Sequence, residues 1–230
     1  MNIKLNYEEK GKGFPLILLH GNGENTNYFK NQINFFSEQY RVIAIDTRGH
    51  GKSPRGKEPF TIRQFAEDLH DFMDDKGIRK AHLLGFSDGG NIVLAFALKY
   101  QERIEKLIVS GANLNTDGVK SSFQLPVTVT YRILSLFSGK EGSIKKKQEL
   151  LGLMVNEPNI EPESLHKVTV PALVIAGTND IIKKEHTELI AASLPNSKLV
   201  FIKGGHSLPK NKSEEFNKIV DQFLEEKKEY

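Results

Sequence analysis

The chain has 230 residues, of which 32 are basic and 29 acidic, giving a formal net charge of +3. This near balance gives no case for nucleic-acid binding, and the absence of cysteine excludes a disulfide framework and a thiol nucleophile. The longest apolar runs, such as residues 92–98, are far shorter than the roughly 20 residues needed to cross a bilayer. We therefore expect a cytoplasmic protein with a single domain over residues 1–230 and no membrane contact.

The N-terminal part of the chain contains three predicted strands. Residues 1–7 alternate apolar and polar side chains, which predicts a half-exposed strand near 3–7 and not a signal peptide. The apolar runs 15–19 and 41–45 predict two further strands. Each of these runs is followed by a polar, glycine-containing segment, first His20-Gly21-Asn22-Gly23 and then Asp46-Thr47-Arg48-Gly49-His50-Gly51-Lys52-Ser53.

The segment Gly85-Phe86-Ser87-Asp88-Gly89 lies where an apolar run over 81–86 meets a helical pattern over 88–100. In a G-x-S-x-G turn between a strand and a helix, the glycines lack a Cβ and let the backbone bend so that the serine hydroxyl is exposed. Ser87 is therefore the candidate nucleophile. The structural alternative is that this serine only caps the helix that follows.

The stretch between the strands predicted near 104–110 and 170–176 is too long for an ordinary connection. Its first part is rich in apolar side chains, and the part over 140–149 is basic and polar. We expect two or three helices here, with the cluster Lys145-Lys146-Lys147 on a solvated helix face. The residues expected to form an apolar face are Phe123, Val127, Val129, Tyr131, Ile133, Leu134, Leu136 and Phe137.

A serine nucleophile needs a base within hydrogen-bond reach and an acid that orients the base. Asp180 follows one late apolar run through a short turn, and His206 follows another through Lys203-Gly204-Gly205. The chain order serine, aspartate, histidine is one of the known triad orders. The structural alternatives are that Asp180 caps a helix beginning near Lys183 and that His206 is a solvated loop residue.

Together these motifs resemble those of the α/β-hydrolase family, in particular its lipase-like and esterase-like members. The matches run from about Pro15 to His206 and are interrupted at about 115–166. The resemblance implies that Ser87, Asp180 and His206 form a catalytic triad and that the interruption is a short helical lid. No metal or other cofactor is expected, because the chain shows no spaced set of histidine or cysteine ligands.

The resemblance also implies an oxyanion hole made by the backbone N–H groups of Asn22 and Asp88. A carboxylate directly after the serine is unusual for esterase-like members. We expect the Asp88 side chain either to complement the helix dipole or to disfavour anionic substrates or attract a cationic group. His20 is expected to order the oxyanion loop. The residues placed at the substrate pocket are His20, Phe123, Val127, Tyr131 and Leu134.

Strands and helices alternate along the chain, which predicts an α/β fold with a mainly parallel, doubly wound sheet. The catalytic candidates then lie at the carboxyl ends of strands, where open α/β sheets bind ligands. Strands are expected near 3–7, 15–19, 41–45, 81–86, 104–110, 170–176 and 198–202, and helices near 26–38, 61–76, 88–100, 183–194 and 211–227.

The function expected from the site is hydrolysis of a small carboxylic ester, or else an amide or thioester, through an acyl-enzyme. A carbon–carbon bond hydrolase of the same fold is the main alternative, and a binding or signalling module that retains the site without turnover is another. Perhydrolase-like members usually carry an uncharged residue at the position of Asp88, and dehalogenase-like members carry a carboxylate at the position of Ser87. The expected partner is a small-molecule ester, and the sequence leaves the oligomeric state open.

Overall fold

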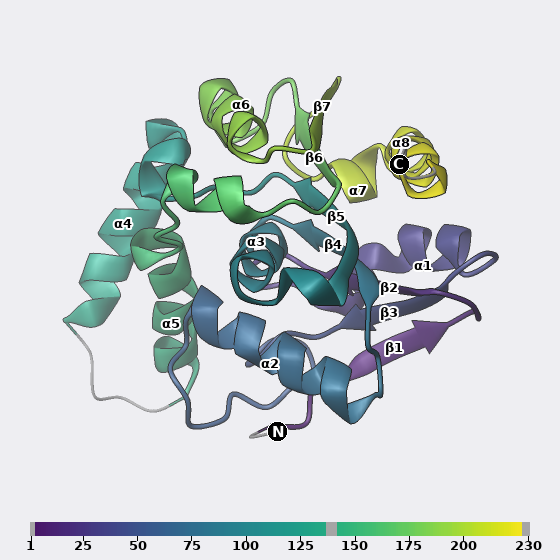
Figure 1. Ribbon diagram of the computed structural model, residues 1–230. Coiled ribbons are helices and arrows are strands. Elements are labelled where there is room, and N and C mark those ends of the chain that lie inside the picture. Colours follow the sequence, from purple (N-terminus) through teal and green to yellow (C-terminus); the bar gives the residue numbers. More distant parts are fainter. Residues whose placement is uncertain (1–2, 137–141, 227–230) are drawn as a thin grey trace.

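The computed structural model describes residues 3–136 and 142–226, and a seven-stranded sheet runs through its centre (Figure 1). The strand order is β1-β3-β2-β4-β5-β6-β7, and every neighbouring pair is parallel except β1 with β3. The α/β fold with a mainly parallel sheet is thus confirmed. The strands are β1 (Tyr7–Lys10), β2 (Pro15–Leu19), β3 (Arg41–Ile45), β4 (Ala81–Phe86), β5 (Ile104–Ser110), β6 (Ala172–Gly177) and β7 (Ser197–Ile202).

Helices cover both faces of this sheet, as Figure 1 shows. Helices α1 (Lys30–Phe36) and α8 (Ser213–Glu225) pack on one face, and α2 (Ile62–Asp75), α3 (Asp88–Tyr100) and α6 (Lys184–Ser193) pack on the other. The remaining helical elements are η1 (Thr26–Phe29), η2 (Gln101–Arg103), η3 (Thr116–Gly118), α4 (Ser121–Ser135), α5 (Ser143–Asn156), η4 (Pro162–Lys167) and α7 (Leu208–Asn211).

Coverage of both faces explains why the central strands are continuous apolar runs. In β2, Leu16 and Leu18 pack into the core under α1 and α8, whereas Ile17 and Leu19 pack into the core under α2 and α3. Because successive side chains of a strand point to opposite faces, a strand buried on both faces needs apolar residues at every position. Because strands β2 to β7 run parallel, their carboxyl ends lie at one edge of the sheet.

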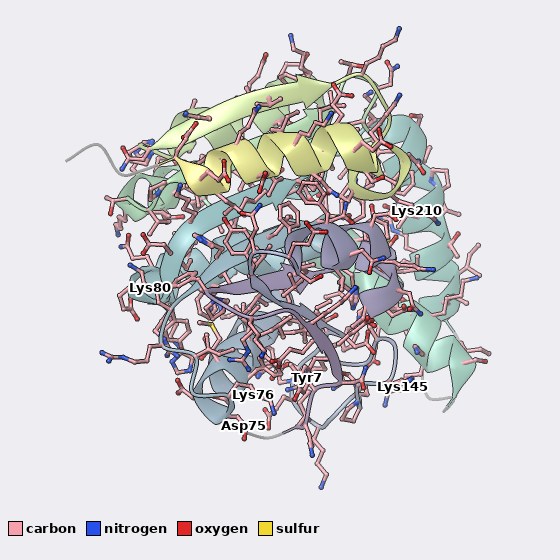
Figure 2. The ribbon with its side chains drawn as sticks, turned by 90° about the vertical axis from the view of Figure 1, so that its right-hand side faces the viewer. Tyr7, Asp75, Lys76, Lys80, Lys145 and Lys210 are labelled. Atoms are coloured by element: carbon pink, nitrogen blue, oxygen red, sulfur yellow. The ribbon has the colours of Figure 1, made fainter. Side chains whose placement is uncertain are left out.

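The first strand differs from its prediction. Residues 3–7 do not form it; β1 begins at Tyr7 and pairs antiparallel with β3, with Tyr7 opposite Ile45 and Lys10 opposite Val42. Ile3 and Leu5 are buried in the core but are not part of a strand. The alternation of apolar and polar residues here therefore reflects burial of the apolar side chains and not pairing of strands. Figure 2 shows Tyr7 beside Lys76, whose Nζ lies 4.7 Å from the centre of the Tyr7 ring.

Two predicted helices are each divided in the structure. The helix expected over 26–38 begins as the 3-10 turn η1 and continues as α1, which ends at Phe36. The helix expected over 211–227 is split into the short α7 and the longer α8, and its expected last residue lies outside the described residues. The predicted helices over 61–76, 88–100 and 183–194 agree with α2, α3 and α6 to within one residue at each end.

The long insertion forms α4 and α5 followed by η4, in agreement with the two or three helices expected there. Its apolar face is arranged differently from the prediction: Val129, Ile133 and Leu136 are exposed, Leu136 by 83%. Helix α4 is held to α5 by polar contacts, among them Gln124 Nε2 donating to the Met154 carbonyl at 2.9 Å. Phe137 and the start of the polar segment over 140–149 lie outside the described residues. No described helix is long and apolar enough to span a membrane.

Candidate active site

Ser87 occupies a sharp turn between β4 and α3. Its φ of 54° and ψ of −121° make it the one non-glycine residue with a positive φ in the described ranges, a backbone conformation that costs energy for a residue with a Cβ. The turn is tightly packed: a Cβ at Gly85 would collide with the carbonyl of Gly89, and a Cβ at Gly89 would collide with the carbonyl of Leu19. The two glycines of the motif are therefore required by close backbone approach, in addition to the sharp bend that the sequence predicted.

The structure brings Ser87, His206 and Asp180 together from three separate loops. His206 Nε2 lies 3.0 Å from Ser87 Oγ, and His206 Nδ1 lies 2.7 Å from Asp180 Oδ1. Because Asp180 accepts at Nδ1, the neutral imidazole carries its proton there and offers Nε2 to the serine hydroxyl. The arrangement can take a proton from Ser87 and hold it on His206 beside a carboxylate.

The Asp180 side chain is 2% exposed and its carboxylate is held by backbone donors. Its Oδ1 accepts from the Ile182 N–H at 3.0 Å, and its Oδ2 accepts from the Gly177 N–H at 3.4 Å. Burial alone would raise the pKa of Asp180, but the hydrogen bond and charge of His206 and these backbone bonds hold the pKa below its ordinary value. The carboxylate therefore stays ionised next to the imidazole. Lys183, not Asp180, is the N-cap residue of α6.

The two backbone N–H groups expected to form an oxyanion hole belong to residues close to Ser87. Asp88 is the first residue of α3, and Asn22 is in the loop after β2, where the neighbouring Gly21 packs against Ser87. Within the described part of the chain, neither N–H donates to a protein acceptor. Both donors are therefore free for a ligand oxygen.

His20 lies beneath this loop. Its Nδ1 lies 2.7 Å from the Gly21 carbonyl, and its Nε2 accepts from the Thr47 N–H at 3.1 Å, so the ring is neutral with its proton on Nδ1. Burial, with the neighbouring His50, lowers the pKa of His20 to about 4, which agrees with this tautomer. Only 1% of His20 is exposed, so it supports the loop from below and does not line the substrate pocket where the sequence also placed it.

The Asp88 side chain connects three segments of the site. Its Oδ2 accepts from Asn22 Nδ2 at 2.9 Å, and the same Nδ2 donates to the carbonyl of Leu150 on α5 at 2.9 Å. Burial raises the pKa of Asp88, although the bond from Asn22 and the proximity of His206 act in the opposite direction. Burial, with the nearby charge of Asp88, also raises the pKa of Glu157. The surroundings of Ser87 are thus rich in carboxyl groups.

Sequence reasoning missed one residue of this site. Glu24 closes the turn after β2, and its Oε2 accepts from the Gly21 N–H at 3.1 Å. Burial raises the pKa of Glu24 to about 7. The available signal was its spacing, since an acid three residues after a glycine in a turn can bond back to the N–H of that glycine.

The other residues predicted at the pocket, Phe123, Val127, Tyr131 and Leu134, lie half-buried on α4. Their contact with a substrate stays a prediction. Among the residues in 3–136 and 142–226, no group of three or more histidine, aspartate or glutamate side chains is arranged to hold a metal ion.

Comparisons with known proteins agree on one fold. The family model of the alpha/beta hydrolase fold matches residues 15–138, more than half of the chain. A 2-hydroxy-6-oxo-6-phenylhexa-2,4-dienoate hydrolase of Comamonas testosteroni is 28% identical, with 97% of this chain and 92% of the relative covered. The solved enol-lactonase of Burkholderia xenovorans LB400 is 22% identical with a TM-score of 0.82, and 97% of each chain is covered. A thermophilic esterase of Thermogutta terrifontis is 25% identical with a TM-score of 0.80, and 96% of this chain and 93% of the esterase are covered.

Proposed function

The chain belongs to the α/β-hydrolase fold family, and we propose that it is a serine hydrolase that cleaves a small carboxylic ester through an acyl-enzyme. The observation that carries the proposal is the continuous set of hydrogen bonds from Ser87 through His206 to Asp180. The same mechanism also applies to an amide or a thioester.

In the proposed mechanism, Ser87 Oγ attacks the substrate carbonyl while His206 Nε2 takes the hydroxyl proton. The carbonyl oxygen gains negative charge and accepts hydrogen bonds from the N–H groups of Asn22 and Asp88. His206 then gives its proton to the leaving alcohol, and Asp180 stabilises the charged imidazole between these steps. A water molecule, activated by His206, releases the acid and restores the serine.

The charge around Ser87 bears on the substrate. The Asp88 carboxylate follows the nucleophile directly, and Glu157 is close enough to Asp88 for their charges to interact. When these carboxyl groups are ionised they repel a carboxylate substrate and attract a cationic one, and the low dielectric of a half-buried site strengthens both effects. A cationic group also favours their ionised forms against the effect of burial. We propose that the site prefers neutral or cationic esters over anionic ones.

A carbon–carbon bond hydrolase is the second candidate, and the dienoate hydrolases among the relatives favour it. The substrates in those names carry a carboxylate, which the acidic surroundings of Ser87 disfavour. Helices α4 and α5 are proposed to act as the lid of the site: α5 is bonded to Asn22, and α4 is bonded to α5.

The first test is hydrolysis of p-nitrophenyl esters of increasing acyl length by the parent protein and by Ser87→Ala. Ser37→Ala is the control, because Ser37 is a surface serine at the end of α1 whose hydroxyl contacts Asn34. We expect turnover by the parent and the control, and none by Ser87→Ala. Equal activity in all three proteins would exclude Ser87 as the nucleophile, and turnover of a dienoate but of no ester would favour the second candidate.

The charge preference is tested with esters that carry a neutral, a carboxylate or an ammonium group on the acyl chain. Asp88→Asn should lower the rate for the ammonium ester relative to the neutral one and raise the rate for the carboxylate ester. Asp75→Asn makes the same change in net charge at the end of α2 and should leave the ranking unchanged. An unchanged ranking in Asp88→Asn contradicts the preference.

A further inference from the structure

The direction of the Asn22 N–H depends on the peptide group that joins Gly21 to Asn22. The carbonyl of Gly21 and the N–H of Asn22 belong to one planar unit and point in opposite directions when the peptide bond is trans. The Gly21 carbonyl accepts from the Glu24 N–H at 3.2 Å and lies 2.7 Å from His20 Nδ1. Whatever fixes this carbonyl also fixes the N–H on the opposite side.

The preceding peptide group is held by the Glu24 side chain. The Gly21 N–H donates to Glu24 Oε2 at 3.1 Å, so Glu24 contacts Gly21 through both its backbone and its carboxylate. Glycine has access to far more backbone conformations than other residues, and Gly23 in the same turn has a φ of 74°. Hydrogen bonds therefore set the conformation of this loop: His20 holds the Gly21 carbonyl, Asp88 and Leu150 hold the Asn22 side chain, and the Glu24 carboxylate holds the Gly21 N–H.

Glu24 is also close to the nucleophile. The point where a Cβ at Gly21 would stand lies 3.1 Å from Glu24 Oε2 and 3.1 Å from the Cβ of Ser87. The charged and titratable groups that face the Glu24 carboxyl are His206, Lys210 and Tyr28. Burial of the Glu24 carboxyl is unfavourable, as its raised pKa indicates. A glutamate that pointed into solvent would not have this cost, so the buried position needs a compensating interaction, and the bond to the Gly21 N–H supplies one.

We propose that Glu24 is a positioning residue for the Asn22 N–H: its carboxylate anchors the Gly21 N–H and so limits rotation about the Gly21 backbone, while its own N–H and His20 hold the Gly21 carbonyl. The inference rests on the proposed function, since it assigns this N–H to an oxyanion hole. Glu24 does not touch the reacting atoms; it acts through the backbone of the loop.

The test compares Glu24→Ala and Glu24→Gln with the parent protein. Glutamine keeps an acceptor oxygen for the Gly21 N–H, and alanine removes it. Loss of an oxyanion donor typically lowers kcat by about 100-fold to 1000-fold, so loss of its alignment in Glu24→Ala is expected to lower kcat by roughly 10-fold to 100-fold with KM within about twofold. Glu24→Gln should keep kcat within about threefold of the parent.

Glu38→Ala is the matched control, because Glu38 is an exposed glutamate beyond the end of α1. It should leave both constants unchanged. An unchanged kcat in Glu24→Ala, or an equal loss in the alanine and glutamine variants, would overturn the proposed role.

A second measurement separates this inference from the proposed function. Hydrogen exchange of the Gly21 amide, followed by NMR without substrate, should be faster in Glu24→Ala than in the parent and in Glu24→Gln, while amides of β4 keep their protection. If the parent hydrolyses no ester, the proposed function fails, and the amide data still decide whether Glu24 anchors the loop. Unchanged protection of Gly21 in Glu24→Ala would refute the anchoring.

Discussion

The buried ion pair between Arg48 and Asp68 allows a quantitative test of what holds the loop after β3. Arg48 Nε donates to Asp68 Oδ2 at 2.7 Å, and Nη2 donates to Oδ1 at 2.6 Å. The side chains are 0% and 6% exposed. Removing one member of a buried pair leaves the other charge without a partner and typically costs about 3–5 kcal/mol. We therefore expect Asp68→Ala to lower the free energy of unfolding by an amount in this range.

The chain contains a matched exposed pair. Arg41 contacts Glu9 through Nε at 2.8 Å and Nη2 at 3.2 Å, with the same two-pronged geometry, but its side chains are 31% and 33% exposed. An exposed pair contributes about 0.2–1 kcal/mol, so Glu9→Ala should cost no more than that. The double variant Arg48→Met/Asp68→Leu should recover most of the loss seen in Asp68→Ala, because neither buried charge remains.

The assay is urea unfolding followed by far-UV circular dichroism, since the chain has no tryptophan to report by fluorescence. If Asp68→Ala costs as little as Glu9→Ala, burial does not govern the energy of the pair and the reasoning is refuted. Activity gives a second readout. Thr47 precedes Arg48 and donates its N–H to His20, so displacement of Arg48 should also lower kcat through the oxyanion loop.

Three further outcomes are expected. Asp180→Asn should lower kcat by up to about 10⁴-fold with little change in KM, because an amide at this position favours the wrong tautomer of His206; a loss under tenfold in the pH-independent kcat would contradict the role of Asp180. His20, with its pKa lowered to about 4, should contribute up to about 3 kcal/mol of stability that is lost as the pH falls from 6.5 to 4. In His20→Asn, the free energy of unfolding measured with urea should therefore vary less with pH over that interval. Glu24, with its pKa raised to about 7, binds its proton more tightly in the folded protein, so the free energy of unfolding should decrease from pH 4.5 to above 7. At pH 8, Glu24→Gln should therefore be more stable than the parent by about 1 kcal/mol, an amount reduced by the partial exposure of the carboxyl. At pH 4 the variant should show no such gain.

Much of the fold could be predicted from the sequence because the central strands are buried on both faces. The runs at β2, β3, β4 and β5 were predicted with the bounds that the structure shows, since a parallel strand covered by helices leaves an uninterrupted apolar signal. The position of β1 could not be predicted from the sequence. Its residues Tyr-Glu-Glu-Lys have no strand pattern, and only pairing with β3 places them in the sheet.

The residues of the site likewise fall into those that the sequence predicted and those that it missed. Ser87, Asp180 and His206 follow strand ends, so local patterns and chain order placed them at one edge of the sheet before their contacts were known. Glu24 was missed although its spacing from Gly21 is a local signal, and Asp68, the partner of Arg48, was missed because their ion pair is a tertiary contact that no local pattern encodes. The exposure of the apolar residues of α4 was missed for a related reason: an apolar pattern indicates a preference for burial but not whether another element is present to cover it.

The outer strand β1 bears on how copies of this protein meet one another. One side of β1 is paired with β3, and its other side is an edge of the sheet. An open edge offers backbone donors and acceptors that can join the sheet of a second molecule and begin aggregation. This edge is only four residues long and carries Glu8, Glu9 and Lys10 at exposed positions. A second strand could dock on β1 only by removing water from these charges, so the short, charged β1 edge disfavours strand addition at this end of the sheet.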